Sequence, residues 1–209
     1  PKEALKHPKW NMGKKISIDS ATLMNKILEL IEAKKIFNYD YSKLKIIIHP
    51  QSLVHAIVKY KNGITKFLYH KPDMMIPISN AIFDNNLDLN EFSTIDKSPD
   101  KIKNLNFFEV DKKRFPIVKI IPKLNNHVSA PIIINAANEI LVDQFLKKKI
   151  SFISITRHLF QVLADKNYKK YAIRRTNNLK DIFMVDKWSR NTTLKILERY
   201  NKWKKYFLS

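Results

Sequence analysis

The chain of 209 residues contains no cysteine and only two glycines. Without cysteine it can form neither a disulfide nor a thiolate metal site. Two glycines are also too few for the glycine-rich turn that binds a dinucleotide. No apolar run approaches the roughly 20 residues of a membrane-spanning helix, and no signal peptide is visible. We therefore expect no membrane partner.

Acidic residues are also scarce: lysine and arginine outnumber aspartate and glutamate by 39 to 19, which gives a net charge of +20. Such an excess favours nucleic acid, because bound cations release counterions from phosphates. The lysines are nevertheless spread along the whole chain, as an AT-rich genome produces, and no zinc-finger, RNP-type or basic-zipper motif occurs. We expect no nucleic-acid partner. A basic helical module in residues 147–205 that binds nucleic acid or an acidic partner is the alternative.

A chain of 209 residues can bury one core or two small ones, and its 44% hydrophobic residues are typical of a globular protein. The fold class expected is α+β, because residues 1–84 mix helix and strand and the rest is mainly helical. Asp19 or Ser20 can cap a helix that runs to about Lys35. Its apolar stripe comprises Met24, Ile27, Leu28 and Ile31. The other elements expected are a strand at 45–48, β-prone runs at 53–60 and 64–69, and a short helix at 77–83.

Asn62-Gly63 between the two β-prone runs predicts a hairpin with a type I′ turn, in which both central residues have positive φ. Residues 85–112 are polar and poorly periodic, which predicts a linker or arm. From residue 113 to 209 the pattern is helical and favours a small bundle. Its apolar stripes are Ala137, Leu141 and Phe145, then Ile155, Leu159 and Leu163, and finally Leu194 and Leu197.

Polar side chains on the first predicted helix suit a phosphorylated, metal-chelating ligand. Ser20, at the expected helix start, could bind phosphate together with unpaired backbone N–H groups. Asn25 and Lys26 would add a neutral donor and a positive charge. Glu29 lies about 6 Å further along the axis and offers the oxygen ligand that Mg²⁺ or Mn²⁺ prefers. The alternative is that Lys26 and Glu29 form an ordinary exposed ion pair.

A loop-like segment precedes this helix and carries His7, Trp10, Met12 and Gly13. An aromatic and a thioether side chain on a loop either pack against the body of the protein or close over a ligand. His7 could donate to a phosphate, and Gly13 would let a cofactor approach the backbone closely. A packed structural loop is the alternative.

Residues 7–33, HPKWNMGKKISIDSATLMNKILELIEA, closely resemble the 1-deoxy-D-xylulose 5-phosphate reductoisomerase family. The resemblance continues, in the family's order, through IHPQS at 48–52 with His55, PDM at 72–74 and NAANE at 135–139. It covers most of the chain. It implies a partial catalytic α/β domain with a short mixed sheet and hairpin at 1–84, an arm at 85–112 and a C-terminal α-helical bundle at 113–209.

The family rearranges 1-deoxy-D-xylulose 5-phosphate and reduces the product with NADPH to 2-C-methyl-D-erythritol 4-phosphate, in non-mevalonate isoprenoid synthesis. A divalent cation, Mg²⁺ or Mn²⁺, assists as a Lewis acid. The resemblance implies that Glu29 is one of three carboxylate metal ligands and that Ser20, Asn25 and Lys26 bind substrate. By the same resemblance His7, Trp10 and Met12 belong to a flap over the substrate, Gly13 contacts NADPH, and Pro72 and Met74 border the pocket.

Other features of the resemblance concern the rest of the protein. His49 and His55 match the family as well, with a structural role in the sheet as the alternative. Ile27 stands where glycine is common and Met75 where arginine is usual. The two other metal ligands and the NADPH domain would precede Pro1, so the chain is expected to be an inactive fragment of a homodimeric enzyme. A non-catalytic dimerisation remnant is a further alternative. The expected location is the cytoplasm, or a plastid-type organelle.

Overall fold

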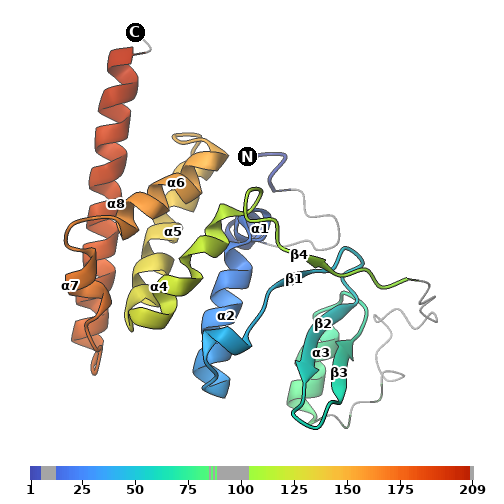
Figure 1. The fold of residues 1–209 in the computed structure, drawn as a ribbon. Helices are drawn as coiled ribbons and strands as arrows, with labels where there is room; N and C mark the ends of the chain where they lie inside the picture. The colour runs from blue at the N-terminus through green and yellow to red at the C-terminus, as the bar shows by residue number, and fades with distance from the viewer. Residues whose placement is uncertain (6–12, 85, 87, 89–103, 208–209) are drawn as a thin grey trace. The chain divides into compact units, whose positions relative to one another are not determined.

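The computed structural model describes residues 1–5, 13–84, 86, 88 and 104–207 (Figure 1). They divide into two compact units. The larger contains the described residues up to Ile46 and from Asp111 onward, and the smaller contains those from Ile47 to Val110. Contacts thus group the first helices with the C-terminal ones, whereas the predicted division into 1–84, 85–112 and 113–209 follows chain order. That division stays a prediction for the whole protein.

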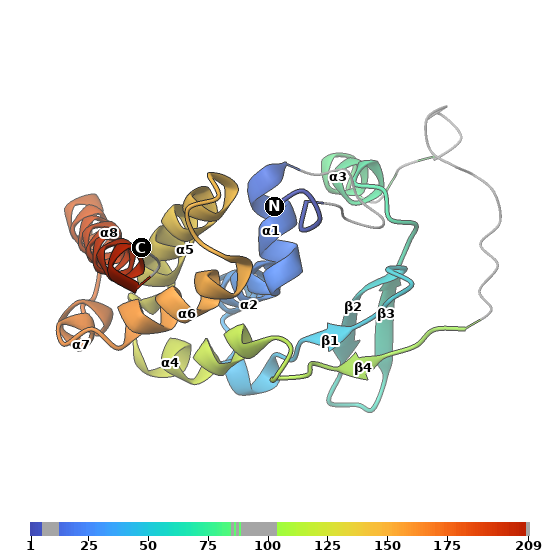
Figure 2. The same cartoon turned by 90° about the horizontal axis from the view of Figure 1, so that it is seen from above.

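The larger unit is helical, as predicted for the C-terminal region. Its helices are α1 (Lys14–Thr22), α2 (Met24–Phe37), α4 (Ile121–Asn126), α5 (Ala130–Leu146), α6 (Phe152–Leu163), α7 (Tyr168–Ala172) and α8 (Leu179–Phe207), with 3-10 turns η1 (Tyr41–Lys43) and η3 (Pro116–Ile120). Helix α5 lies between α8 on one side and α1 and α2 on the other (Figures 1 and 2). Its Ile133, Ile134 and Leu141 are fully buried and form the centre of the core.

The predicted first helix is in fact two helices, so its expected start at Asp19 or Ser20 was wrong. Helix α1 already begins at Lys14. It ends at Thr22, and Leu23, whose φ is 67°, separates it from α2. The Thr22 hydroxyl donates to the Ile18 carbonyl at 3.0 Å and accepts from the Met24 N–H at 3.4 Å. Threonine thereby competes with the helical hydrogen bonds of its own turn. Met24, Ile27 and Leu30 are the buried residues of α2, while Leu28 and Ile31 are only half-buried.

Helix α8 packs against α5 and α6 through a face that is largely polar. Val185, Ser189, Thr193 and Leu197 are buried, and the Ser189 hydroxyl donates to the Ile133 carbonyl of α5 at 2.7 Å. Leu194, expected to begin the buried stripe, is 43% exposed. The buried face of α8 thus includes small hydroxylated residues, which apolar spacing alone does not reveal. Although α8 is 29 residues long, no helix in the described ranges is apolar enough to cross a membrane.

An ionic network also joins α8 to α5. The Arg190 guanidinium donates to Glu139 at 2.6 Å and to Asp186 at 2.7 Å, and Asn135 donates to Glu139 at 3.1 Å. Hydrogen bonds to Asp186 and Glu139 raise the pKa of Arg190. These side chains are partly exposed, so the network fixes the register of the two helices more than it adds stability.

The smaller unit contains two antiparallel ladders and a helix. Strand β1 (Ile47–Ile48) pairs with β4 (Phe108–Glu109), β2 (Val54–Lys59) pairs with β3 (Thr65–Tyr69), and α3 spans Met75–Ile82. Both ladders are antiparallel, so the expected mixed sheet was wrong. The strand expected at 45–48 is only two residues long, and its partner β4 lies within the segment predicted to be a linker. Pairing over such a sequence distance leaves no local signal.

The predicted hairpin forms, but its turn is not type I′. Gly63 has φ 87°, while Asn62 is not among the residues with positive φ. The Gly63 N–H donates to the Tyr60 carbonyl at 3.1 Å, and the Tyr60 N–H donates to the Ile64 carbonyl at 2.8 Å. These bonds close a three-residue loop that ends in a left-handed glycine, the next most common class of hairpin. The Asn62 side chain caps the loop by accepting from the Ile64 N–H at 3.1 Å.

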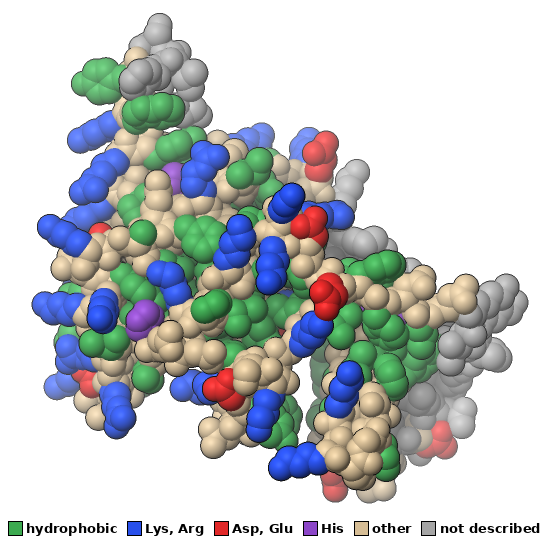
Figure 3. Space-filling view, in the orientation of Figure 1, with side chains coloured by type: hydrophobic (Ala, Val, Ile, Leu, Met, Phe, Trp, Pro, Cys, Tyr) green, Lys and Arg blue, Asp and Glu red, His purple; other side chains and the backbone are tan. Residues whose placement is uncertain are grey.

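Basic side chains do not form one patch on the face drawn in Figure 3, where Lys and Arg are spread out with hydrophobic side chains between them. Several cations have acidic partners, such as Lys147 with Asp143 at 2.8 Å and Arg174 with Asp181 at 2.9 Å.

Alkaline pH is expected to destabilise the helical unit through Tyr168. Burial raises the pKa of Tyr168 to about 12, above the 10 of an exposed tyrosine. The neutral Tyr168 hydroxyl therefore contributes fully to the free energy of unfolding below pH 10. As the pH rises toward 12 this contribution, about 2 to 3 kcal/mol, is lost. Tyr168→Phe should flatten the fall of the unfolding free energy between pH 10 and 12. Tyr206→Phe, at an 83% exposed position, should leave that fall as in the wild type.

Candidate functional site

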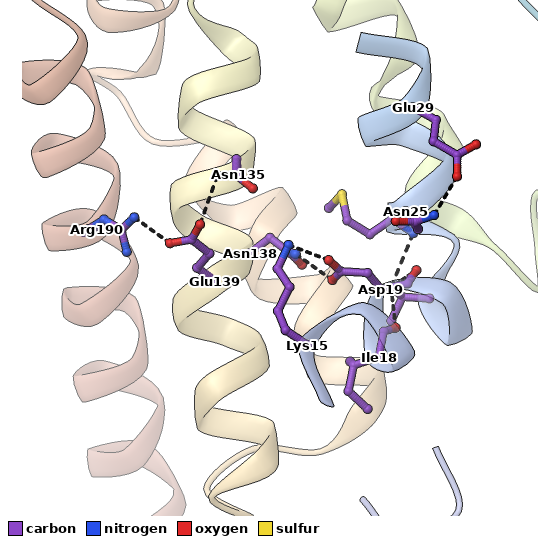
Figure 4. Close-up of polar contacts among 11 residues, drawn as sticks. Lys15, Ile18, Asp19, Asn25, Glu29, Asn135, Asn138, Glu139 and Arg190 are labelled. Carbon is purple, nitrogen blue, oxygen red and sulfur yellow. Dashed lines mark hydrogen bonds and ion pairs between the residues drawn. The ribbon is translucent and has the colours of Figure 1, made fainter. Parts of the chain in front are cut away.

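Three of the predicted site residues, Asn25, Lys26 and Glu29, lie together on the first two turns of α2. Figure 4 shows two of them, Asn25 and Glu29. The Asn25 amide donates to Glu29 Oε1 at 2.6 Å, and the Lys26 ammonium donates to Glu29 Oε2 at 2.7 Å. Each Glu29 carboxylate oxygen accepts one of these bonds and can still accept a second contact. The arrangement is an oriented anionic ligand beside a cation and an amide donor, which suits a metal ion next to an anionic substrate.

The Lys26–Glu29 contact by itself is also what an exposed helical ion pair looks like. Both side chains are 46% exposed, where such a pair contributes at most about 1 kcal/mol. The described part of the chain holds no cluster of three His, Asp or Glu side chains able to bind a metal ion. Among the described residues, Glu29 therefore has no neighbouring His, Asp or Glu side chains that would complete a metal site with it.

Ser20 does not occupy the helix start expected for a phosphate site. It lies half-buried in the last turn of α1, where its carbonyl accepts from the Leu23 N–H at 3.1 Å. The nearby helix start belongs to α2 instead, and Asn25 and Lys26 lie in its first turn. The break at Leu23 therefore moves the unpaired backbone N–H groups from Ser20 toward Asn25 and Lys26.

The flap predicted from His7, Trp10 and Met12 lies outside the described residues. Gly13, which follows it, precedes α1 with an ordinary φ of −58°. A Cβ built at Gly13 would meet no atom within 4 Å, so the described structure does not itself require a glycine there. Its predicted contact with NADPH stays a prediction.

The other matched residues of the first region fall in the smaller unit. Pro72 is half-buried and Met74 is 54% exposed just before α3. The His49 ring stacks on Phe107 with centroids 4.8 Å apart, and the His55 ring stacks on His70 at 3.7 Å. Both contacts favour the structural alternative for these two histidines.

The two departures from the family pattern differ in their surroundings. Ile27 is fully buried in the core of the larger unit, so its side chain fills space that glycine would leave empty. Met75 is 43% exposed, and its N–H donates to Asp73 at 2.9 Å.

The larger unit also contains a buried polar cluster that the sequence does not predict. Asp19 is 1% exposed and accepts from the Asn138 amide at 2.8 Å and from the Lys15 ammonium at 2.6 Å (Figure 4). The sequence predicts only a helix-capping role for Asp19. The available signal was that Asp19 and Asn138 each belong to a block that carries the family resemblance.

Two family models assign this helical region to the C-terminal part of reductoisomerase-type proteins. The family model described as DXP reductoisomerase C-terminal domain matches residues 70–192. A second model, described as 1-deoxy-D-xylulose 5-phosphate reductoisomerase C-terminal domain, matches residues 1–37. The chain belongs to the 1-deoxy-D-xylulose 5-phosphate reductoisomerase family.

Curated relatives carry the name 1-deoxy-D-xylulose 5-phosphate reductoisomerase. That of Pelagibacter ubique is 46% identical over 182 residues, which cover 87% of this chain and 46% of the relative. That of Wolbachia pipientis wMel is 44% identical over 202 residues, which cover 94% of this chain and 50% of the relative. The chain thus spans about half the length of the relatives it matches.

Solved structures agree with this assignment. The Zymomonas mobilis reductoisomerase in complex with NADPH has a TM-score of 0.80 at 34% identity, over 95% of this chain and 49% of that one. A DOX-P reductoisomerase in complex with NADPH, fosmidomycin and magnesium has a TM-score of 0.87 at 33% identity, over 96% of this chain and 50% of that one.

Proposed function

We propose that this chain is the C-terminal part of an NADPH-dependent enzyme that converts 1-deoxy-D-xylulose 5-phosphate to 2-C-methyl-D-erythritol 4-phosphate. The observation that carries the proposal is the Glu29 carboxylate, held by Asn25 and Lys26 within the stretch that matches the family model. Family membership supports this function and gives no support to the basic nucleic-acid-binding module. The scattered cations on the face drawn in Figure 3 likewise favour the enzyme over that module.

In this proposal Glu29 is one ligand of Mg²⁺ or Mn²⁺, because its exposed oxygens retain lone pairs and have the hard character these ions prefer. The bound cation supplies Lewis-acid stabilisation of negative charge on the substrate. Lys26 and Asn25 bind the substrate's polar groups with a charge and an amide beside that ligand. Ser20 contributes a hydroxyl from the end of α1.

The remaining roles rest on the family assignment. His7, Trp10 and Met12 would close over the substrate, Pro72 and Met74 would border its pocket, and Gly13 would contact NADPH. An upstream domain would bind most of the NADPH and provide the other two metal ligands, and the protein would be a homodimer. Solved relatives that contain NADPH and magnesium support this assignment of cofactors.

Purified residues 1–209 are expected to show no turnover with NADPH, whereas the full-length protein should be active. The physical reason is that one carboxylate holds Mg²⁺ weakly without partner ligands. The measurement is NADPH oxidation with 1-deoxy-D-xylulose 5-phosphate, run on both proteins with and without chelator. Turnover by residues 1–209 would contradict the division of the site, and an inactive full-length protein would contradict the proposed function.

A further inference from the structure

The buried hydrogen bond between Asp19 and Asn138 joins two helices that are 119 residues apart in sequence. Asp19 lies on α1 and Asn138 on α5, and the two are 1% and 0% exposed. Asp19 Oδ1 accepts from Asn138 and Oδ2 accepts from Lys15, so both carboxylate oxygens have donors. Figure 4 shows the two donors converging on the Asp19 carboxylate.

This pair is costly as a means of stabilising the fold. Taking a carboxylate out of water carries a desolvation penalty that its partners often only offset. The Asn138 amide also leaves its own buried Oδ1 without a hydrogen-bond partner in the described structure. An apolar pair of similar size would commonly be as stable or more so. We therefore expect the Asp19–Asn138 hydrogen bond to serve mainly to hold α1 in position, and not to stabilise the fold.

The position in question is the end of α1. Asp19 directly precedes Ser20, and its carbonyl accepts from the Thr22 hydroxyl at 3.2 Å. Leu23 follows in the left-handed region, which costs a non-glycine residue on the order of 1 to 3 kcal/mol. Such a conformation persists only where surrounding contacts hold it. Here the Thr22 hydroxyl bonds to both sides of the break, and Asp19 fixes the turn before it to α5.

We propose that Asn138 is a positioning residue: by holding Asp19 it fixes the α1–α2 break, and so the relative placement of Ser20 and the Asn25, Lys26 and Glu29 face. The C-terminal helical bundle thereby controls substrate and metal binding by residues of the first two helices. This inference rests on the proposed function, in which those residues bind the substrate and the metal ion.

The test exchanges the two partners in the full-length protein. Asn138→Asp places two carboxylates in contact and should raise the KM for substrate and the Mg²⁺ concentration needed for half-maximal rate about tenfold or more. Asp19→Asn keeps an acceptor for Asn138 and should change both much less. The double variant Asp19→Asn with Asn138→Asp restores an amide-to-carboxylate hydrogen bond and should recover wild-type values to within about threefold.

Asn135→Asp is the matched control. Asn135 lies one turn earlier on α5 and donates to Glu139, so its replacement also brings two carboxylates together but away from Asp19. It should leave the KM and the Mg²⁺ requirement unchanged. If Asn138 had a purely structural role, Asn138→Asp would lower the melting temperature, but its KM and Mg²⁺ requirement would be the same as those of Asn135→Asp.

Amide hydrogen exchange provides a readout that does not need turnover. In Asn138→Asp, protection should fall at residues 20–26 and not in α6, and the double variant should regain it. A folded Asn138→Asp with wild-type KM, Mg²⁺ requirement and protection would overturn the inference, as would a double variant that recovers nothing. If Asn138→Asp does not fold, the double variant against Asp19→Asn decides by the same measurements. An inactive wild-type protein would sink the proposed function, while exchange would still decide whether Asn138 holds the break.

Discussion

Replacement of Glu29 by glutamine in the full-length protein is expected to lower kcat by about 100-fold or more while the fold stays intact. Glutamine keeps an oxygen that can accept from the Asn25 amide, now 2.6 Å away, so the helix face should retain its shape. It removes the negative charge that makes a carboxylate a strong ligand for a hard cation. Loss of several kcal/mol of Lewis-acid stabilisation corresponds to a rate decrease of about this size.

The measurement is kcat across a Mg²⁺ titration, because weaker metal binding could be masked or exaggerated at one concentration. Glu32→Gln is the matched control: Glu32 is exposed on α2, three residues further along, and carries the same charge. It should retain wild-type kcat. A Glu29→Gln variant with wild-type kcat at saturating Mg²⁺ would remove Glu29 from the metal site and leave only the exposed ion pair with Lys26.

Features that depend on local spacing could be read from the sequence. The helices around Leu141 and Leu159 follow from apolar residues at helical intervals, and both side chains are fully buried. The Lys61–Gly63 hairpin follows from turn chemistry. In both cases the residues that determine the structure are near neighbours in the chain.

Features that depend on distant contacts could not be read in this way. The break at Leu23 carries no glycine to mark it, and it is held by Thr22 and by the long-range bond of Asp19 to Asn138. Ser20 was consequently placed at a helix start that does not exist. The pairing of β1 with β4 likewise has no local signal. The contacts of Asn25 and Lys26 with Glu29, by contrast, follow from their spacing of four and three residues within α2.

Leu197→Ala is expected to destabilise the helical unit by about 3 kcal/mol, whereas Leu194→Ala should cost less than about 1 kcal/mol. Both leucines lie on α8 and were predicted to share a buried stripe, but Leu197 is 4% exposed and Leu194 43% exposed. Truncation at 197 leaves a cavity in the packing of α8, while truncation at 194 removes surface already largely in water. The chemical change and the helix are the same, so the difference isolates burial.

Native-state hydrogen exchange of the α8 amides would measure this difference as local unfolding free energies. Equal effects of the two variants would mean that the stripe follows simple apolar spacing and that Ser189 and Thr193 do not define the buried face. A large effect of Leu197→Ala alone would support close approach through those hydroxylated residues. Packing of α8 against one side of α5 would then also keep α5 fixed, so that Asn138 can hold Asp19 on the other side.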